Sequence, residues 1–296
     1  MGNLGTTWQM MKTAAAVLWH NKLLVILPLV AGILTWVLAL ILIPGQIGMG
    51  LEASGDGASG AATADDGPNL VVLFLFYIGS YFVVTFFNSA LIECAFQRMT
   101  GGDATVAGGL SAATSRIDKI AGWALLAGTV GLVIDQLEKR SKGAKEVIVS
   151  TIGFAWSMAT YLAVPAMIAQ GLGPFAALQE SVRLLKETWG EQLIGEISFS
   201  ALGMLLGVIG FLVIGGIGLA AGANPLALLS DEPVSPALVT CIVVLVLYLL
   251  TLAIVISALS TVYRAALYLY ADTGEAPEGF DLDALAGTIK SEITTN

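Results

Sequence analysis

Short amphipathic segments alternate with long apolar stretches along this chain, and the alternation repeats three times. In each unit an amphipathic segment runs directly into an apolar stretch, and a second apolar stretch follows. The amphipathic segments cover residues 7–20, 105–118 and 173–189. The helical spacing of their apolar positions predicts one amphipathic helix followed by two longer apolar helices in every unit.

Six apolar stretches approach the length needed to cross a membrane, because about 20 apolar residues span roughly 30 Å of hydrocarbon. They cover residues 23–43, 70–95, 119–135, 147–169, 191–222 and 237–270. None shows the alternation over about ten residues that is typical of a membrane β-barrel strand. The pattern predicts an all-α fold, a polytopic membrane protein with six transmembrane helices in three hairpins. Each hairpin is preceded by an amphipathic interfacial helix.

Composition indicates the same class of protein. Of the 296 residues, 56% are hydrophobic and only 12% are charged, whereas soluble domains carry roughly 25% charged residues. We expect one integral membrane domain over residues 1–285, surrounded by membrane lipids, and a short tail over residues 286–296. Its pseudo-repeat units cover about residues 5–100, 101–171 and 172–272.

Each amphipathic segment gathers apolar side chains on one helical face. In the second segment this face carries Val106, Leu110, Ala113, Ile117 and Ile120, and in the third it carries Phe175, Leu178, Val182, Leu185 and Trp189. Thr7 and Thr105 are candidate N-caps, and Pro174 suits a first helical turn. Such helices lie in the membrane interface with their apolar face toward the acyl chains.

The distribution of basic residues indicates which side of the membrane is cytoplasmic. With both termini inside, six crossings place these basic residues inside: Lys12, Lys22, Arg98, Arg116, Lys119, Arg183, Lys186, Arg264 and Lys290. The outer loops 44–69 and 223–236 then contain acidic residues and no Lys or Arg. We therefore predict a cell-membrane protein whose N- and C-termini are both cytoplasmic.

The loop 135–146 disagrees with this orientation, because it places Lys139, Arg140, Lys142 and Lys145 outside. Two interpretations remain open. In the first, which we favour, stretch 119–135 crosses the membrane and the neighbouring carboxylates balance most of these charges. In the second, stretches 119–135 and 147–169 form a re-entrant hairpin, which would have to be buried in protein or line an aqueous cavity.

Ionisable side chains inside the apolar stretches are functional candidates, because a charge within a membrane is costly. Glu93 and Arg264 occupy comparable positions near the inner ends of the second and sixth stretches, where an ion pair would satisfy both. Asn88, Ser257 and Ser260 lie within about two helical turns of them. Either these residues form a polar clasp that fixes helix register, or they line a track for a solute or a proton.

Two further features interrupt the apolar stretches. Glu196 lies deeper in the fifth stretch than Glu191, so it is the better candidate for a buried carboxylate. The alternative is a hydrogen bond between Glu196 and a neighbouring helix or the lipid headgroups. Pro165 in the fourth stretch is expected to kink or end its helix, because proline removes a helical hydrogen bond.

Glycines recur at short spacings in the fifth stretch. They are Gly203, Gly207, Gly210, Gly215, Gly218 and Gly222. Small residues at such spacings let membrane helices approach closely. They therefore predict either packing within the chain or a contact between subunits of a homo-oligomer.

The sequence contains no recognisable enzyme motif. His20 is the only histidine, so a histidine-based triad or zinc cluster is not expected, and we expect no cofactor and no metal. Cys94 and Cys241 lie inside apolar stretches, which predicts small core residues. The formal net charge of −9 argues against nucleic acid as a partner, because such a partner needs a basic patch.

Three short runs and the C-terminal region carry a family resemblance. The runs are 122–126 (GWALL), 155–161 (AWSMATY) and 186–191 (KETWGE), followed by 266–270 (ALYLY) through 279–281 (GFD). They resemble a family of uncharacterised prokaryotic six-helix integral membrane proteins, over most of residues 5–285. More distantly, the repeat is similar to the membrane domain joined to some glycerophosphodiester phosphodiesterases. The resemblance implies a six-helix membrane fold and brings no established activity with it.

Two classes of function remain open. The first is a channel or transporter for a small solute, ion or lipid, which would use Asn88, Glu93, Glu196 and Arg264. The second is a non-catalytic membrane-organising or scaffolding protein that forms a homo-oligomer through the glycines of the fifth stretch. A continuous water-accessible path would favour the first class. The identity of any small-molecule substrate stays unknown.

Overall fold

The computed structural model describes residues 12, 14, 15, 22–42, 70–225, 227, 235–274 and 277, without the side chains of residues 22, 23, 70, 144 and 187–198. The described elements are helical throughout: a 3-10 turn η1 (Lys22–Val25), then α2 (Ile26–Leu42), α4 (Leu70–Met99), α5 (Val106–Thr114), α6 (Ile117–Arg140), α7 (Ala144–Ala159), α8 (Ala163–Gln170), α9 (Pro174–Ala220) and α10 (Pro236–Thr273). The all-α prediction is therefore confirmed for this part of the chain.

Five helical segments in the described part are long and apolar enough to cross a membrane, by length and composition. They are Val71–Met99, Ile117–Arg140, Lys145–Gln170, Phe199–Ala220 and Pro236–Thr273. Helix α2, the predicted first crossing, has only 17 residues, at the short end of the range for a membrane span. The structure thus supports a multi-pass membrane protein with five such segments rather than the six that the sequence predicted.

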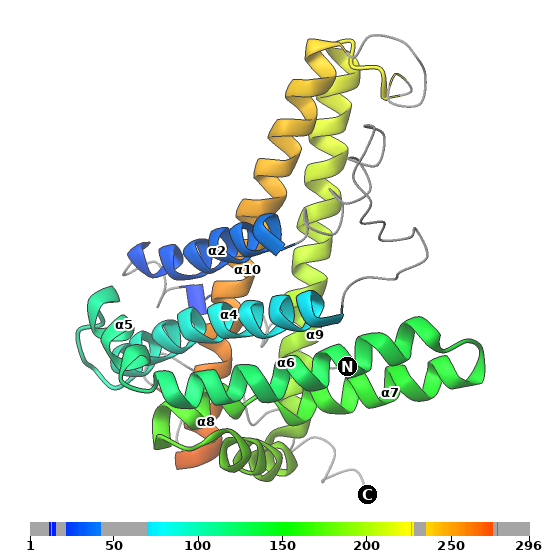
Figure 1. Ribbon diagram of the computed structural model, residues 1–296. Coiled ribbons are helices and arrows are strands. Elements are labelled where there is room, and N and C mark those ends of the chain that lie inside the picture. The colour runs from blue at the N-terminus through cyan, green and yellow to red at the C-terminus, as the bar shows by residue number, and fades with distance from the viewer. Residues whose placement is uncertain are drawn as a thin grey trace, which may run out of the picture.

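Helices α2, α4, α6 and α7 run roughly alongside one another, whereas the α9–α10 hairpin crosses this group and projects beyond it (Figure 1). Helices α6 and α7 extend side by side to a tight turn at Gly143, which has a φ of +64°. Because α6 is one unbroken helix of 24 residues, it is about 36 Å long. A helix of this length and composition is sufficient to cross a membrane, and the crossing itself stays a prediction.

The predicted third amphipathic helix is not a separate element. Residues 174–189 continue without a break into the following apolar stretch as α9, a single helix of 47 residues. Glycine in a helix costs only about 1 kcal/mol relative to alanine. Gly190 therefore does not end the helix, and no proline follows it within α9. The prediction of Pro174 in the first turn is confirmed.

The second amphipathic segment forms α5, which packs against the end of α4. Thr105 is its N-cap, as predicted, and the Thr105 hydroxyl accepts a hydrogen bond from the N–H of Gly108 over 3.1 Å. The Cβ that an alanine would carry at position 109 lies 2.5 Å from the Ala90 carbonyl oxygen and 2.5 Å from the Cys94 sulfur. Glycine at this position therefore permits a close approach between α5 and α4. The first amphipathic segment, residues 7–20, lies largely outside the described residues.

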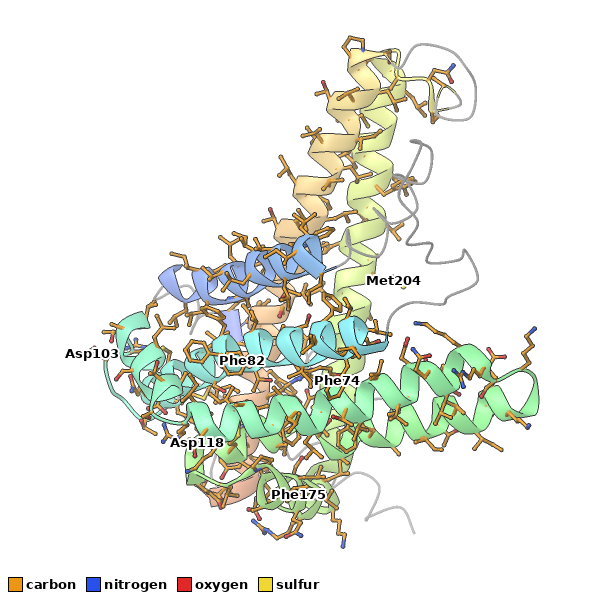
Figure 2. All side chains as sticks on the ribbon, in the orientation of Figure 1. Phe74, Phe82, Asp103, Asp118, Phe175 and Met204 are labelled. Carbon is orange, nitrogen blue, oxygen red and sulfur yellow. The ribbon has the colours of Figure 1, made fainter. Side chains whose placement is uncertain are left out.

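The buried core lies where the ends of α4 and α10 meet α8. Its fully buried members include Leu91, Ala95, Leu162, Ala166, Met167, Val262 and Tyr268. The projecting part of α9 and α10 is instead covered with exposed aliphatic and aromatic side chains, such as Met204, which is 74% exposed (Figure 2). Exposed apolar surface on this scale is expected where lipid replaces water around a protein.

Candidate functional site

The candidate site forms around an interruption in the predicted fourth apolar stretch. Helix α7 ends at Ala159 and α8 begins at Ala163. Pro165 has no N–H to donate to the carbonyl of Tyr161, four residues earlier, so a continuous helix would lose that hydrogen bond. The prediction that Pro165 kinks or ends its helix is therefore confirmed.

The interruption is held by a side chain from another helix. The backbone N–H of Leu162 donates a hydrogen bond of 3.1 Å to the hydroxyl oxygen of Ser181 on α9. Both residues are buried, where a backbone N–H without a partner would be costly. Ser181 thus supplies the hydrogen bond that the broken helix cannot make itself.

Arg264 reaches the same interruption from α10. Its guanidinium carbon lies 4.5 Å from the centroid of the Tyr161 ring, which is itself buried. This distance is within the range of a cation–π contact. The guanidinium of arginine carries a fork of N–H donors whose geometry matches carboxylate and phosphate groups.

The predicted ion pair between Glu93 and Arg264 is not among the ion pairs of the described residues. The carboxylate of Glu93 instead accepts a hydrogen bond of 3.0 Å from the side-chain amide of Gln97, one turn further along α4. Helices α4 and α10 meet through the rings of Phe96 and Tyr268, whose centroids are 5.8 Å apart. This aromatic contact joins the two helices near their ends.

The other predicted polar residues are dispersed. Asn88 and Ser260 are half-buried on α4 and α10, whereas Ser257 is exposed. The side chain of Glu196 lies outside the described residues. Next to Asn88, the fully buried hydroxyl of Ser89 has no hydrogen-bond partner in the part of the chain that is described. The structure therefore brings Arg264 to the interruption and leaves Glu93 and Ser257 elsewhere.

Sequence reasoning missed Tyr161 and Ser181 as members of the site. The sequence contained one indication for Tyr161, because it precedes Pro165 by four residues. In a continuous helix the Tyr161 carbonyl would accept a hydrogen bond from residue 165, and proline has no N–H to donate. The sequence contained no such indication for Ser181, since its role depends on the way α9 packs against α8.

The rings of Phe199 and Tyr263, with centroids 5.5 Å apart, join α9 to α10 at the residue before Arg264.

A second polar network holds the end of α8. The side-chain amide of Gln170 donates hydrogen bonds to the Tyr268 hydroxyl over 2.9 Å and to the Glu180 carboxylate over 3.2 Å. Arg183 donates to the same carboxylate over 2.9 and 2.6 Å. The bond from Arg183 lowers the pKa of Glu180, as does the weaker bond from Gln170. The network ties together α8, the first turns of α9 and the end of α10.

The N-terminal end of α6 contacts the end of α8, next to this polar network. The Lys119 ammonium donates a hydrogen bond to the carbonyl of Gly171, the residue that ends α8 in a left-handed conformation with a φ of 65°. A cation at the C-terminal end of a helix is stabilised by the helix dipole and by the exposed carbonyl groups there. These bonds therefore fix the ends of α8 and α10 and the starts of α6 and α9 relative to one another.

Comparison with known protein families places the chain in one of them. Residues 68–279 match a family of unknown function, DUF6159. The chain belongs to this family. The DUF6159 match includes the interrupted helix, Ser181 and Arg264, whereas α2 lies before it. No curated protein and no solved structure matches the chain, and no link to the membrane domains of glycerophosphodiester phosphodiesterases is found.

The glycines of α9 in this DUF6159 protein differ in their surroundings. An added Cβ at Gly210 would lie 2.0 Å from the Tyr248 ring, and one at Gly218 would lie 2.6 Å from the Cys241 sulfur, both on α10. Gly203 and Gly207 leave room for ordinary contacts with α10, at 3.7 and 3.8 Å. Nothing lies within 4 Å of such an atom at Gly215 or Gly222. Gly210 and Gly218 thus pack within the chain.

The described residues contain no group of three or more side chains of the types that could hold a metal ion. Both cysteines have free thiols. The thiol of Cys94 donates to the Thr105 carbonyl over 3.3 Å, and that of Cys241 donates to the Ile214 carbonyl over 3.4 Å. Cys94 is a buried core residue, as the sequence predicted, whereas Cys241 is only half-buried between α9 and α10.

Proposed function

We propose that this protein is a channel or transporter for a small solute, and that the solute passes the interruption between α7 and α8. The observation that carries the proposal is the contact between the Arg264 guanidinium and the Tyr161 ring at that interruption, over 4.5 Å. A cationic side chain inside an apolar helix is costly and usually functional. Interrupted helices in membrane transporters commonly form the binding site, because their backbone groups are available there.

The chemistry of the site suggests which solutes to test first. A guanidinium favours oxyanions, since its N–H groups match the spacing of two carboxylate or phosphate oxygens. Among small solutes, carboxylates and phosphate are therefore the leading candidates.

We propose that α2 completes a set of six crossings in three hairpins, with α2 paired to α4, α6 to α7–α8, and α9 to α10.

The orientation follows from the same proposal. The end of α4, the start of α6 and the start of α9 carry Arg98, Arg116, Lys119, Arg183 and Lys186. These helix ends gather on one side of the molecule (Figure 1). By the rule that basic residues remain inside, we place this side in the cytoplasm of the cell, together with both termini. We assign the protein no catalytic activity.

The test is a flux assay with purified protein in liposomes, loaded with acetate, succinate, phosphate, chloride or an uncharged sugar. We expect flux of at least one oxyanion, and a loss of about tenfold or more in Arg264→Ala, which corresponds to about 1.4 kcal/mol. Tyr161→Phe keeps the aromatic face and should retain flux, whereas Tyr161→Leu should lower it. Ser257→Ala, at an exposed position on α10, is the matched control.

Two results would contradict the proposal. One is the absence of wild-type flux for every solute in the panel. The other is equal flux in wild type and Arg264→Ala. Gel filtration and thermal unfolding of each variant in detergent separate loss of transport from loss of folding, because a folded variant without flux has lost the site alone.

A membrane-organising role is the second candidate, and the projecting α9–α10 hairpin favours it. On this hairpin Gly215 and Gly216 have open space above them, and a neighbouring helix could approach closely at such positions. The test is the oligomeric state of the protein in lipid nanodiscs, measured by native mass spectrometry. A homo-oligomer that Gly216→Leu converts to a monomer would support this role, and a monomeric wild type would contradict it.

A further inference from the structure

The tip of the α6–α7 hairpin carries a dense group of basic side chains. Lys139 and Arg140 end α6, Lys142 lies in the turn and Lys145 belongs to the first turn of α7. All four are exposed. Figure 2 shows long side chains at this tip reaching away from the rest of the protein. We call these four residues the basic tip.

In the described part of the chain, an ion pair neutralises one member of the basic tip. The Lys139 ammonium lies 2.7 Å from a carboxylate oxygen of Asp135 on the same helix. Among the described residues no salt bridge involves Arg140, Lys142 or Lys145. The nearby Glu138 and Glu146 are exposed as well. Three cations therefore point into the surroundings of the protein without a fixed counter-charge from the described chain.

Apolar side chains that face outward adjoin the basic tip directly. On α7 Val147 and Ile148 are 66% and 60% exposed, immediately after Lys145, and on α6 Leu137 and Val133 are also exposed. In a membrane protein such side chains contact acyl chains, and the cations beyond them reach the headgroup layer. The boundary between the hydrocarbon and the headgroups thus passes through this tip.

We propose that the basic tip binds the headgroup phosphates of anionic phospholipids. Charge complementarity and the continuous lipid-facing apolar surface favour this partner. An acidic protein would meet the tip only beyond the headgroups, and the net charge of −9 of the whole chain opposes nucleic acid. The rule that basic loop residues lie on the cytoplasmic side would place these four residues in the cytoplasm. Binding to anionic headgroups gives them a role at the end of the hairpin on the other side of the membrane. The proposal is independent of the proposed transport function.

The test compares lipid adducts by native mass spectrometry of the full-length protein, in micelles that contain equal amounts of phosphatidylglycerol and phosphatidylcholine. Each basic residue near an anionic surface favours binding about fivefold. The variant Arg140→Gln/Lys142→Gln/Lys145→Gln should therefore reduce the preference for phosphatidylglycerol at least fivefold. Its thermal unfolding should stay unchanged, because the three side chains are exposed.

The matched control removes the same charge at the opposite end of the bundle, as Arg98→Gln/Arg116→Gln/Lys186→Gln. We expect this control to lose less of the preference for phosphatidylglycerol than the tip variant, because its charges are spread over α4, the residue before α6 and α9. Addition of inorganic phosphate should not displace the lipid, which distinguishes a lipid headgroup from free phosphate. An equal loss of preference in both triple variants would overturn the proposal, because net charge alone would then explain binding. An unchanged preference in the tip variant, or displacement by free phosphate, would overturn it too.

Discussion

The hydroxyl oxygen of Ser181 accepts a hydrogen bond of 3.1 Å from the backbone N–H of Leu162, 19 residues earlier in the chain. Ser181 is 1% exposed and Leu162 is fully buried, so water does not compete for this bond. The interruption between α7 and α8 therefore depends on α9 for its hydrogen bonding. The position of Tyr161, and with it the contact to Arg264, follows from the same interruption.

Replacement of Ser181 by alanine should destabilise the protein. The variant leaves the buried N–H of Leu162 without its acceptor, and such a loss costs about 1–3 kcal/mol. Thermal or denaturant unfolding of the purified protein in detergent measures the effect. Ser257→Ala, at an exposed position of α10, should unfold like the wild type, and equal stability of Ser181→Ala and wild type would show that the bond is unimportant.

Replacement of Gly109 by alanine should separate α5 from α4. The new Cβ would lie 2.5 Å from both the Ala90 carbonyl oxygen and the Cys94 sulfur, and one of these contacts is to backbone that cannot turn away. Overpacking of this kind costs about 1–3 kcal/mol. The control is Gly32→Ala on α2, where nothing lies within 4 Å of the added atom, and its unfolding temperature should not fall. If the two variants unfold alike, α4 and α5 do not pack as closely as the structure indicates.

A pair of glycines on α9 offers a second matched comparison. Gly210→Ala would place a methyl group 2.0 Å from the Tyr248 ring, whose hydroxyl donates a bond of 2.8 Å to the Leu206 carbonyl. The ring must move, so we expect a loss of about 1–3 kcal/mol in stability. Gly216→Ala has open space and should not lower stability, because alanine favours a helix more than glycine does. A disulfide between cysteines placed on α9 and α10 near these positions would form more slowly in Gly210→Ala.

The Glu180 network predicts a particular dependence of stability on pH. The pKa of Glu180 is lowered in the folded protein, chiefly by the bond from Arg183, from an ordinary value of 4.5. A carboxyl group with a lowered folded pKa contributes stability above its unfolded pKa and loses it as the pH falls through the folded pKa. The unfolding temperature of the wild type should therefore decrease as the pH is lowered below 4.5. The unfolding temperature of Glu180→Gln should decrease less steeply over the same pH range. Parallel pH curves for the two proteins would contradict this assignment.

The fold class and several local details could be predicted from the sequence, because they depend on short-range properties. The apolar stretches led to the long helices, Thr105 and Pro174 marked two helix starts, and Pro165 marked the interruption. The number of crossings was less certain, since α2 is near the lower limit of length. The prediction of a separate third interfacial helix was wrong, because a single glycine at position 190 does not end a helix when the residues on both sides of it favour the helical conformation.

The candidate site could be predicted only in part. Arg264 was identifiable as a charge within an apolar stretch. Its partner was not, because similar positions on α4 and α10 suggested Glu93, whereas the helix rotation brings Phe96 to Tyr268 and leaves Glu93 with Gln97. Sequence position along two helices sets the depth of a residue and leaves its direction around the helix axis open.

The sequence by itself determined that this protein is a helical membrane protein, because hydrophobic length and the scarcity of charge act on each segment independently. It also determined where the fourth stretch breaks, since proline acts within one helical turn. Only the tertiary structure decided that Arg264 contacts Tyr161 and that Ser181 accepts a hydrogen bond at the interruption between α7 and α8. It also decided that the Tyr248 ring packs against Gly210. These contacts depend on how each helix is rotated and packed against its neighbours, and that is settled by the whole assembly of helices at once.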